Sequence, residues 1–319
     1  TELGRTVSLR CFFLEKKKAA YVKLRQFADA TADATIETRN AAFEDSIVEI
    51  LDFINKGGPK SFTFLFIDPT GWTGFAMERI APLLRTTPGE VLINFMTSHI
   101  RRFIESPDEA TQASFDELFG RHVPRTRFDG LSGFDLDDAL VAEYSESVAS
   151  VGGFKYVRPA IVLHPGINKT HFHLIYATRN AKGVEVFKYA EKEAMSVMDT
   201  ARANTQQRKR QRKKGQGELF GSETLYDSKQ YESLRQRYLG RSKSRVINLL
   251  QRKEKVSYDD AWDAALQEPL VWESNLKDWI KQWEATGEIQ LDGLKPRERT
   301  PKREHGHSLA WQQGTGPSP

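Results

Sequence analysis

The chain has 319 residues, enough to bury a substantial core and to form a main domain plus a smaller one. Its formal charge is +4 with a pI near 8.9, and the basic residues concentrate after position 200, which indicates an anionic partner for the C-terminal part. Cys11 is the only cysteine, which excludes an internal disulfide, a cysteine zinc site and an iron–sulfur cluster bound by this chain alone, and fits a reducing cytoplasm. No run of about 18 apolar residues and no signal-peptide pattern occurs, so neither membrane spanning nor secretion is supported.

The first hundred residues alternate between strand and helix patterns. Strands are predicted at 7–15, 34–38, 61–68 and 89–96, with helices at 16–30, 47–54 and 75–86 between them. This rhythm is typical of an open parallel sheet wound with right-handed crossovers, so the predicted fold class is α/β with a Rossmann-like sheet. The third strand is continuously apolar, which predicts that helices cover both of its faces.

The next hundred residues complete the first predicted domain. A helical insertion is expected over residues 97–150, and it is followed by an antiparallel hairpin of strands 156–164 and 171–180 around the turn-rich "PGINK". One long helix follows, over residues 181–198. The run rich in Arg, Lys, Gln and Gly at 202–222 is read as a basic linker, which divides the chain into a domain of residues 1–201 and a second one of residues 223–319.

The C-terminal segment predicts three helices and a hairpin. The helix patterns are residues 243–253, 257–266 and 273–287, the second opening on Ser257 as N-cap, and short strands follow at 289–291 and 308–311. Three helices followed by a β-hairpin is the winged-helix arrangement, which can lie against DNA. The loop between the two strands carries the candidate nucleic-acid contacts Arg297, Arg299, Lys302 and Arg303. The run "RKRQRKK" adds Arg208, Lys209 and Arg210, although such runs are also common as solvated linkers.

Polar residues follow three of the predicted strands of the first domain. In an open α/β sheet, ligands bind beyond the carboxyl ends of the strands, and Glu15 and Asp68 stand at such ends. An acid at the end of the second strand of a nucleotide-binding sheet is placed to bind ribose hydroxyls, and Asn40 and Phe43 are placed to cover or hydrogen-bond an adenine. Two alternatives stay open: Glu15 simply begins a solvated helix, and Asp68-Pro69 is simply a turn.

Three stretches together resemble a known family. "FFLEKKKAAYVKL", "FTFLFIDPTGWTG" and "HLIYATRNAKGVEVFK", in this order and spacing, are similar to the three-Cys-motif partner proteins, whose core resembles S-adenosylmethionine-dependent methyltransferases. The resemblance implies S-adenosylmethionine as cofactor and a separate radical-SAM-like three-Cys-motif protein as partner. It places Glu15 on the ribose, and Asp68 and Pro69 on the acceptor side of the pocket.

The match departs from the methyltransferase pattern in two places. Amino-group methyltransferases have Asp/Asn-Pro-Pro-aromatic, whereas here Thr70 and Gly71 follow Pro69 and the indole comes one position late, at Trp72. The glycine-rich loop follows the first strand of that family, and nothing before residue 7 can be this loop. The first strand and its loop are therefore expected upstream of Thr1, or else the cofactor is not bound.

These observations lead to one leading function, one rival and a less favoured third, a DNA-binding regulator. The leading prediction is a methyltransferase-like component, with Asp68, Pro69 and Trp72 as catalytic residues, that works with the radical-type partner and has nucleic acid as a candidate substrate. The rival is a non-catalytic adaptor that recruits nucleic acid to that partner. No metal site is predicted, since His171 and His173 lack a third ligand.

Overall fold

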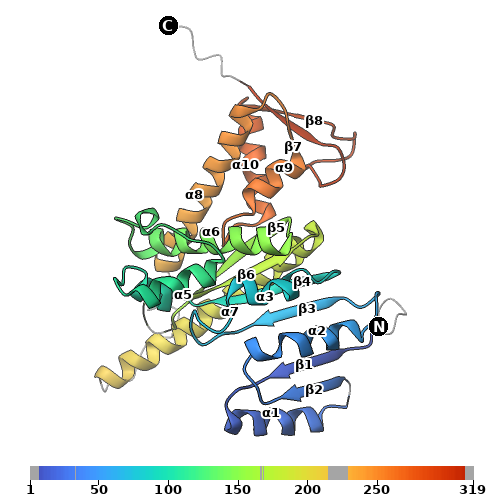
Figure 1. Ribbon diagram of the computed structural model, residues 1–319. Helices are drawn as coiled ribbons and strands as arrows, with labels where there is room; N and C mark the ends of the chain where they lie inside the picture. The colour runs from blue at the N-terminus through green and yellow to red at the C-terminus, as the bar shows by residue number, and fades with distance from the viewer. Residues whose placement is uncertain (1–6, 33, 166, 168, 215–228, 313–319) are drawn as a thin grey trace. The chain divides into compact units, whose positions relative to one another are not determined.

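The computed structural model describes residues 7–32, 34–165, 167, 169–214 and 229–312. The protein is a mixed α/β chain, about 51% helical, whose strands pair both parallel and antiparallel (Figure 1). The chain divides into two compact units, Thr1–Lys155 and Tyr156–Pro319. These units are defined by contacts between residues and not by independent folding, so the domain boundary predicted at 202–222 stays a prediction. In the described part of the chain, no helix combines the length and the apolar character that membrane spanning needs.

The first unit contains the four early strands in two parallel pairs. The elements are β1 (Arg10–Leu14), α1 (Lys18–Ala30), β2 (Thr35–Arg39), η1 (Glu44–Ser46), α2 (Ile47–Asn55), β3 (Thr63–Ile67), α3 (Met77–Leu84) and β4 (Gly89–Phe95). The predicted order of strands and helices is confirmed. The prediction of one continuous sheet is wrong for the described residues, because β1 pairs with β2 and β3 pairs with β4, and neither pair is hydrogen-bonded to the other.

Strand β3 is covered on one face only. Thr63 and Leu65 are half-buried and Ile67 is buried, whereas Phe62, Phe64 and Phe66 on the other face are 59%, 56% and 53% exposed. The prediction that helices cover both faces is therefore wrong. A run of apolar residues gives the period of a strand but does not say how many layers pack on it.

The predicted helical insertion after β4 is confirmed. It consists of α4 (Thr97–Phe103), α5 (Glu109–Phe119), η2 (Arg125–Arg127) and α6 (Gly133–Gly152). Tyr144 of α6 is fully buried and stacks on Phe95 at 4.4 Å between ring centroids, which fixes α6 over the end of β4. Gly120 ends α5 with a φ of 67°, and a Cβ there would lie 2.8 Å from Met77, so both the backbone and the packing require glycine.

The second unit begins with the predicted antiparallel hairpin. Strand β5 (Tyr156–Leu163) pairs antiparallel with β6 (Thr170–Thr178), and α7 (Ala181–Lys214) follows. Helix α7 is longer than predicted, because residues 202–214 of the expected linker continue it. Arg, Lys and Gln are good helix formers, so a charged run can extend a helix as readily as end it. Residues 215–222 of the predicted linker lie outside the described residues.

Three helices and a small sheet complete the second unit. The elements are α8 (Lys229–Arg252), β7 (Val256–Ser257), α9 (Tyr258–Ala265), α10 (Glu273–Ala285), β8 (Ile289–Asp292) and β9 (Ser308–Trp311), with the strands in the order β7-β9-β8. The predicted helices 257–266 and 273–287 and both predicted strands are confirmed, whereas the helix predicted at 243–253 begins earlier, at Lys229, and β7 was not predicted. Ser257 caps α9 by accepting a hydrogen bond from the backbone N–H of Asp260 at 3.0 Å. Trp279 and Trp283 of α10 are buried, as their spacing predicts.

Candidate ligand site at the strand ends

The carboxyl ends of β3 and β4 bring Asp68 beside Asn94. The parallel register pairs Ile67 with Ile93, so the next residue of each strand lies opposite the other. Asn94 Nδ2 donates to Asp68 Oδ1 at 2.6 Å, with Asp68 exposed and Asn94 only 8% exposed. Since a carboxylate only accepts, this bond fixes the orientation of the Asn94 amide. Its Oδ1 is then a buried acceptor without a partner among the described residues. Such an atom costs about 1–3 kcal/mol and is rarely left unbonded without a reason.

Trp72 lies in the loop after β3 but is already engaged. Its Nε1 donates to Ser114 Oγ at 2.9 Å. Its ring stacks on Phe115 at 5.4 Å and contacts Phe103 at 5.0 Å, both centroid distances. The structure therefore places Trp72 in the packing of α4 and α5, where its indole N–H and one ring face are in use. Pro69 is half-buried in the same loop, next to Asp68.

The ends of β1 and β2 bring Glu15 and Asn40 together. Asn40 Nδ2 donates to the backbone oxygens of Glu15 and Lys16 at 2.7 and 3.0 Å, and Glu15 Oε1 accepts from the backbone N–H of Lys17 at 2.7 Å. The bond to the N–H of Lys17 is the one expected of an acid at the start of a helix. Glu15 Oε1 therefore has the helix-starting role that the sequence offers as the alternative to ligand binding. Phe43 is half-buried just before η1.

The Glu15–Asn40 pair and the Asp68–Asn94 pair lie on the same side of the first unit. Strands β1 and β3 point the same way in Figure 1, and each pairs in parallel, so all four strands end on the same side. Among the described residues at these strand ends, the exposed acceptors for which no bond is found are Glu15 Oε2, Asn40 Oδ1 and the second oxygen of Asp68, in addition to the buried Asn94 Oδ1. Ribose hydroxyls and an adenine amine are donors, so Glu15 and Asn40 fit the nucleoside part of S-adenosylmethionine.

The predicted nucleic-acid residues differ in availability. Arg297, Arg299 and Lys302 are exposed. Arg303 is only 13% exposed in its side chain, bonds to Glu185 and Asp259, and lies 4.4 Å over the ring of Trp262. Its guanidinium therefore links the β8–β9 loop to α7 and α9 within the second unit and is not available to a ligand. For Arg208, Lys209 and Arg210, the backbone belongs to α7, and their side chains lie outside the described residues.

The loop between β8 and β9 holds a cluster that the sequence alone does not reveal. Glu298 Oε2 accepts from the backbone N–H of Lys295 at 3.1 Å, and its two oxygens contact His305 Nδ1 at 3.1 Å and His307 Nε2 at 3.0 Å. The group has the composition of a metal site. However, His307 Nδ1 accepts from the backbone N–H of Lys302 at 2.8 Å, so Nε2 carries the proton and donates to Glu298. The cluster therefore acts as a hydrogen-bonded clasp of the loop.

The clasp predicts a pH dependence of stability. The backbone N–H of Lys295, followed by the bonds from His307 and His305, lowers the pKa of Glu298 to about 2. A carboxyl group whose pKa is lowered in the folded protein stabilises the fold at pH values above its ordinary pKa. This stabilisation is lost as the pH falls from about 4.5 towards 2. Thermal unfolding of the wild type and Glu298→Gln should therefore show a difference in Tm that is constant from pH 7 to 5 and shrinks below it. A difference that stays constant down to pH 2 would contradict the clasp.

Two other features were not predicted from the sequence. Arg237, Arg241 and Arg245 recur every four residues in α8, a signal that the sequence does carry. Asn94 is a single amide in the apolar strand "VLINF", with no signal of its own.

Comparison of the chain with protein-family models, with curated proteins and with solved structures finds no match in any of the three.

Proposed function

We propose that this chain is a methyltransferase-like component that works with a radical-SAM-like three-Cys-motif protein, as the resemblance implies. The observation that supports the proposal best is the Asp68–Asn94 pair, which combines an exposed acid with a buried, unsatisfied amide oxygen at the carboxyl ends of two parallel strands. Glu15 and Asn40 at the ends of β1 and β2 add acceptors suited to a nucleoside.

Each residue then has a defined role. S-adenosylmethionine supplies an activated methyl group when bound. Glu15 accepts hydrogen bonds from the ribose, while Asn40 and Phe43 bind the adenine. Asn94 holds one oxygen of Asp68, which leaves the other oxygen to orient the acceptor and to accept its proton. Because the methyl donor is already activated, holding the acceptor in line supplies most of the catalysis.

The rival function keeps the same fold without methyl transfer. In it the chain is an adaptor that binds nucleic acid for the partner enzyme. Binding of S-adenosylmethionine separates the two functions, because only the methyltransferase-like component needs it.

Replacement of Glu15 provides the test. Glu15→Ala should weaken S-adenosylmethionine binding by about 10- to 150-fold, since lost hydrogen bonds to a charged acceptor cost about 1.5–3 kcal/mol. Calorimetric titration should be made on the protein together with any residues that precede Thr1. Asp52→Ala is the matched control, because it removes another exposed acid of the same unit and should bind normally. Absence of binding heat with the wild-type protein would reject the methyltransferase-like function in favour of the adaptor.

A further inference from the structure

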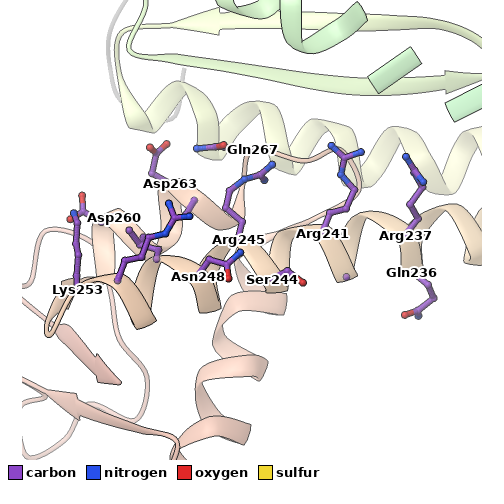
Figure 2. A pocket seen from close by; sticks show the side chains of 14 residues that line it. Gln236, Arg237, Arg241, Ser244, Arg245, Asn248, Lys253, Asp260, Asp263 and Gln267 are labelled. Carbon is purple, nitrogen blue, oxygen red and sulfur yellow. The ribbon is translucent and has the colours of Figure 1, made fainter. Parts of the chain in front are cut away.

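A groove of about 1010 Å³ runs along α8 in the second unit (Figure 2). Its row of arginines is engaged within the protein. Arg241 and Arg245 pair with the buried Glu268, and Arg237 is likewise engaged. These arginines therefore hold the second unit together. A smaller pocket in the first unit differs, because its charged side chains are not used in this way.

This smaller pocket lies in the helical insertion of the first unit and has a volume of about 300 Å³. Its lining comes from the residues just after α4, from η2 and from the residues just after η2: Ile104, Glu105, Arg125, Phe128 and Asp129. A volume at the lower end of the range for ligand sites suits a small metabolite and not a nucleotide. Because Ile104 follows Phe103, whose ring contacts Trp72 at 5.0 Å, the pocket also adjoins the packing of the loop after β3.

Contacts from α5 and α6 fix both walls of the pocket. On one wall, Gln112 Nε2 of α5 donates to the backbone oxygens of Ile104 and Ser106 at 3.2 and 3.0 Å. On the other wall, Arg127 of η2 forms an ion pair with Glu143 of α6, which is buried. Since both walls are held by the protein itself, the pocket does not have to be ordered by its ligand, which favours binding.

The charged side chains of the pocket are not engaged by the protein. Glu105, Arg125 and Asp129 are exposed, and no hydrogen bond or ion pair of their side chains is found among the described residues. Two carboxylates disfavour a ligand that is only an anion, and the guanidinium disfavours a ligand that is only a cation. A ligand with both charges satisfies both. Arg125 can bind a carboxylate through two parallel N–H bonds, and the two acids can accept from an ammonium group.

The rest of the lining is apolar. Ile104 and Phe128 are only 4% and 3% exposed, and they form the part of the pocket that lies against the core of the insertion. Their side chains carry no hydrogen-bonding group, so this part of the pocket suits a hydrocarbon group of the ligand. An ammonium, a carboxylate and a hydrocarbon side chain on one small molecule define an apolar α-amino acid.

We infer that this pocket binds a free apolar α-amino acid. The carboxylate of the ligand lies against Arg125, its ammonium against Glu105 and Asp129, and its side chain on Ile104 and Phe128. The inference goes beyond the proposed function and does not rest on methyl transfer. The N-terminal residue of a peptide lacks the free carboxylate and the C-terminal residue lacks the ammonium, so either peptide end would satisfy only part of the pocket.

Calorimetric titration of the full chain tests the inference. The probes are L-leucine, L-isoleucine, L-valine, L-methionine and L-phenylalanine, and at least one of them should bind. The amide of that amino acid lacks the carboxylate, and its N-acetyl derivative lacks the ammonium. Each derivative should bind about tenfold or more weakly than the amino acid, since each loses hydrogen bonds between charged groups.

Variants assign each charge to its partner. Arg125→Ala should weaken binding of the amino acid about tenfold or more but leave binding of its amide nearly unchanged, because the amide has no carboxylate for Arg125. Glu105→Gln/Asp129→Asn should likewise weaken binding of the amino acid and leave binding of its N-acetyl derivative nearly unchanged. Arg102→Ala and Glu117→Gln replace exposed charged residues outside the lining, so these controls should bind normally. Since all the replaced side chains are exposed, Tm should stay the same.

The comparison of ligands on the wild-type protein does not depend on how the variants fold. Three results would overturn the inference: no binding of any of the five amino acids, binding of the amide or the N-acetyl derivative as tight as that of the amino acid, or equal weakening in the control variants.

Discussion

Lys188→Ala is expected to lower the free energy of unfolding by about 3–5 kcal/mol, because it leaves Glu191 as an unpaired buried charge. Both side chains are buried on α7, with Lys188 Nζ 3.0 Å from Glu191 Oε2 and 2.7 Å from the backbone oxygen of Glu268. Burial lowers the pKa of Lys188 and raises that of Glu191, while their contact opposes both shifts. Urea unfolding followed by circular dichroism measures the change.

The other carboxylate oxygen of Glu191 explains why the expected loss of stability is large. Glu191 Oε1 accepts from the backbone N–H of Leu270 at 3.0 Å, and Leu270 is buried with a φ of 59°, a strained conformation for a branched residue. The double variant Lys188→Met/Glu191→Gln should recover much of the lost stability, since it removes both charges and keeps an acceptor near the backbone. A double variant as unstable as Lys188→Ala would contradict the ion pair as the cause. Lys192→Ala, an exposed neighbour on α7, is the control and should change little.

Asp68→Asn is expected to reduce methyl transfer by about 10²- to 10⁴-fold while leaving S-adenosylmethionine affinity unchanged. The substitution keeps the shape of the side chain but removes the charge that, in the proposed function, orients the acceptor and takes its proton. Transfer of a radiolabelled methyl group to duplex DNA or structured RNA, in the presence of the three-Cys-motif protein, measures the effect. Asp45→Asn, another exposed acid of the first unit, is the control.

The outcome also decides the role of the loop after β3. Full activity of Asp68→Asn would assign "IDPTGW" to turn geometry alone. Trp72→Ala serves as a separate probe, because its contacts with Ser114, Phe103 and Phe115 predict a loss of stability of about 3–5 kcal/mol. A loss of activity with unchanged stability would instead favour direct contact of Trp72 with the acceptor.

The sequence predicts local elements well and long-range contacts poorly. The β5–β6 hairpin, the Ser257 cap and the buried face of α10 each follow from residues close in the chain, and all three are confirmed. The apolar run of β3 predicts coverage of both faces wrongly, because coverage depends on layers that are distant in the chain. The extension of α7 is not predicted, because a charged run is typical of a linker as well as of an exposed helix.

The candidate site shows the same division. Its position at the strand ends follows from the alternation of strands and helices, and the structure brings Glu15 to Asn40. The partner of Asp68 could not be predicted, because it depends on the register between β3 and β4. Lys188 and Glu191 lie 80 and 79 positions from their main-chain partners at 268 and 270, so no local pattern reveals these contacts.

The open aromatic face of β3 has a consequence for how the purified protein behaves. Strand β3 is the outer strand of its sheet among the described strands, so an unpaired backbone edge adjoins Phe62, Phe64 and Phe66. Edges of this kind join with those of other molecules unless charge or proline blocks them. We therefore expect self-association that grows with protein concentration and with salt, and that a lysine in place of Phe64 suppresses. Light scattering of dilute and concentrated samples would reveal it, and ligand titrations belong in the dilute range.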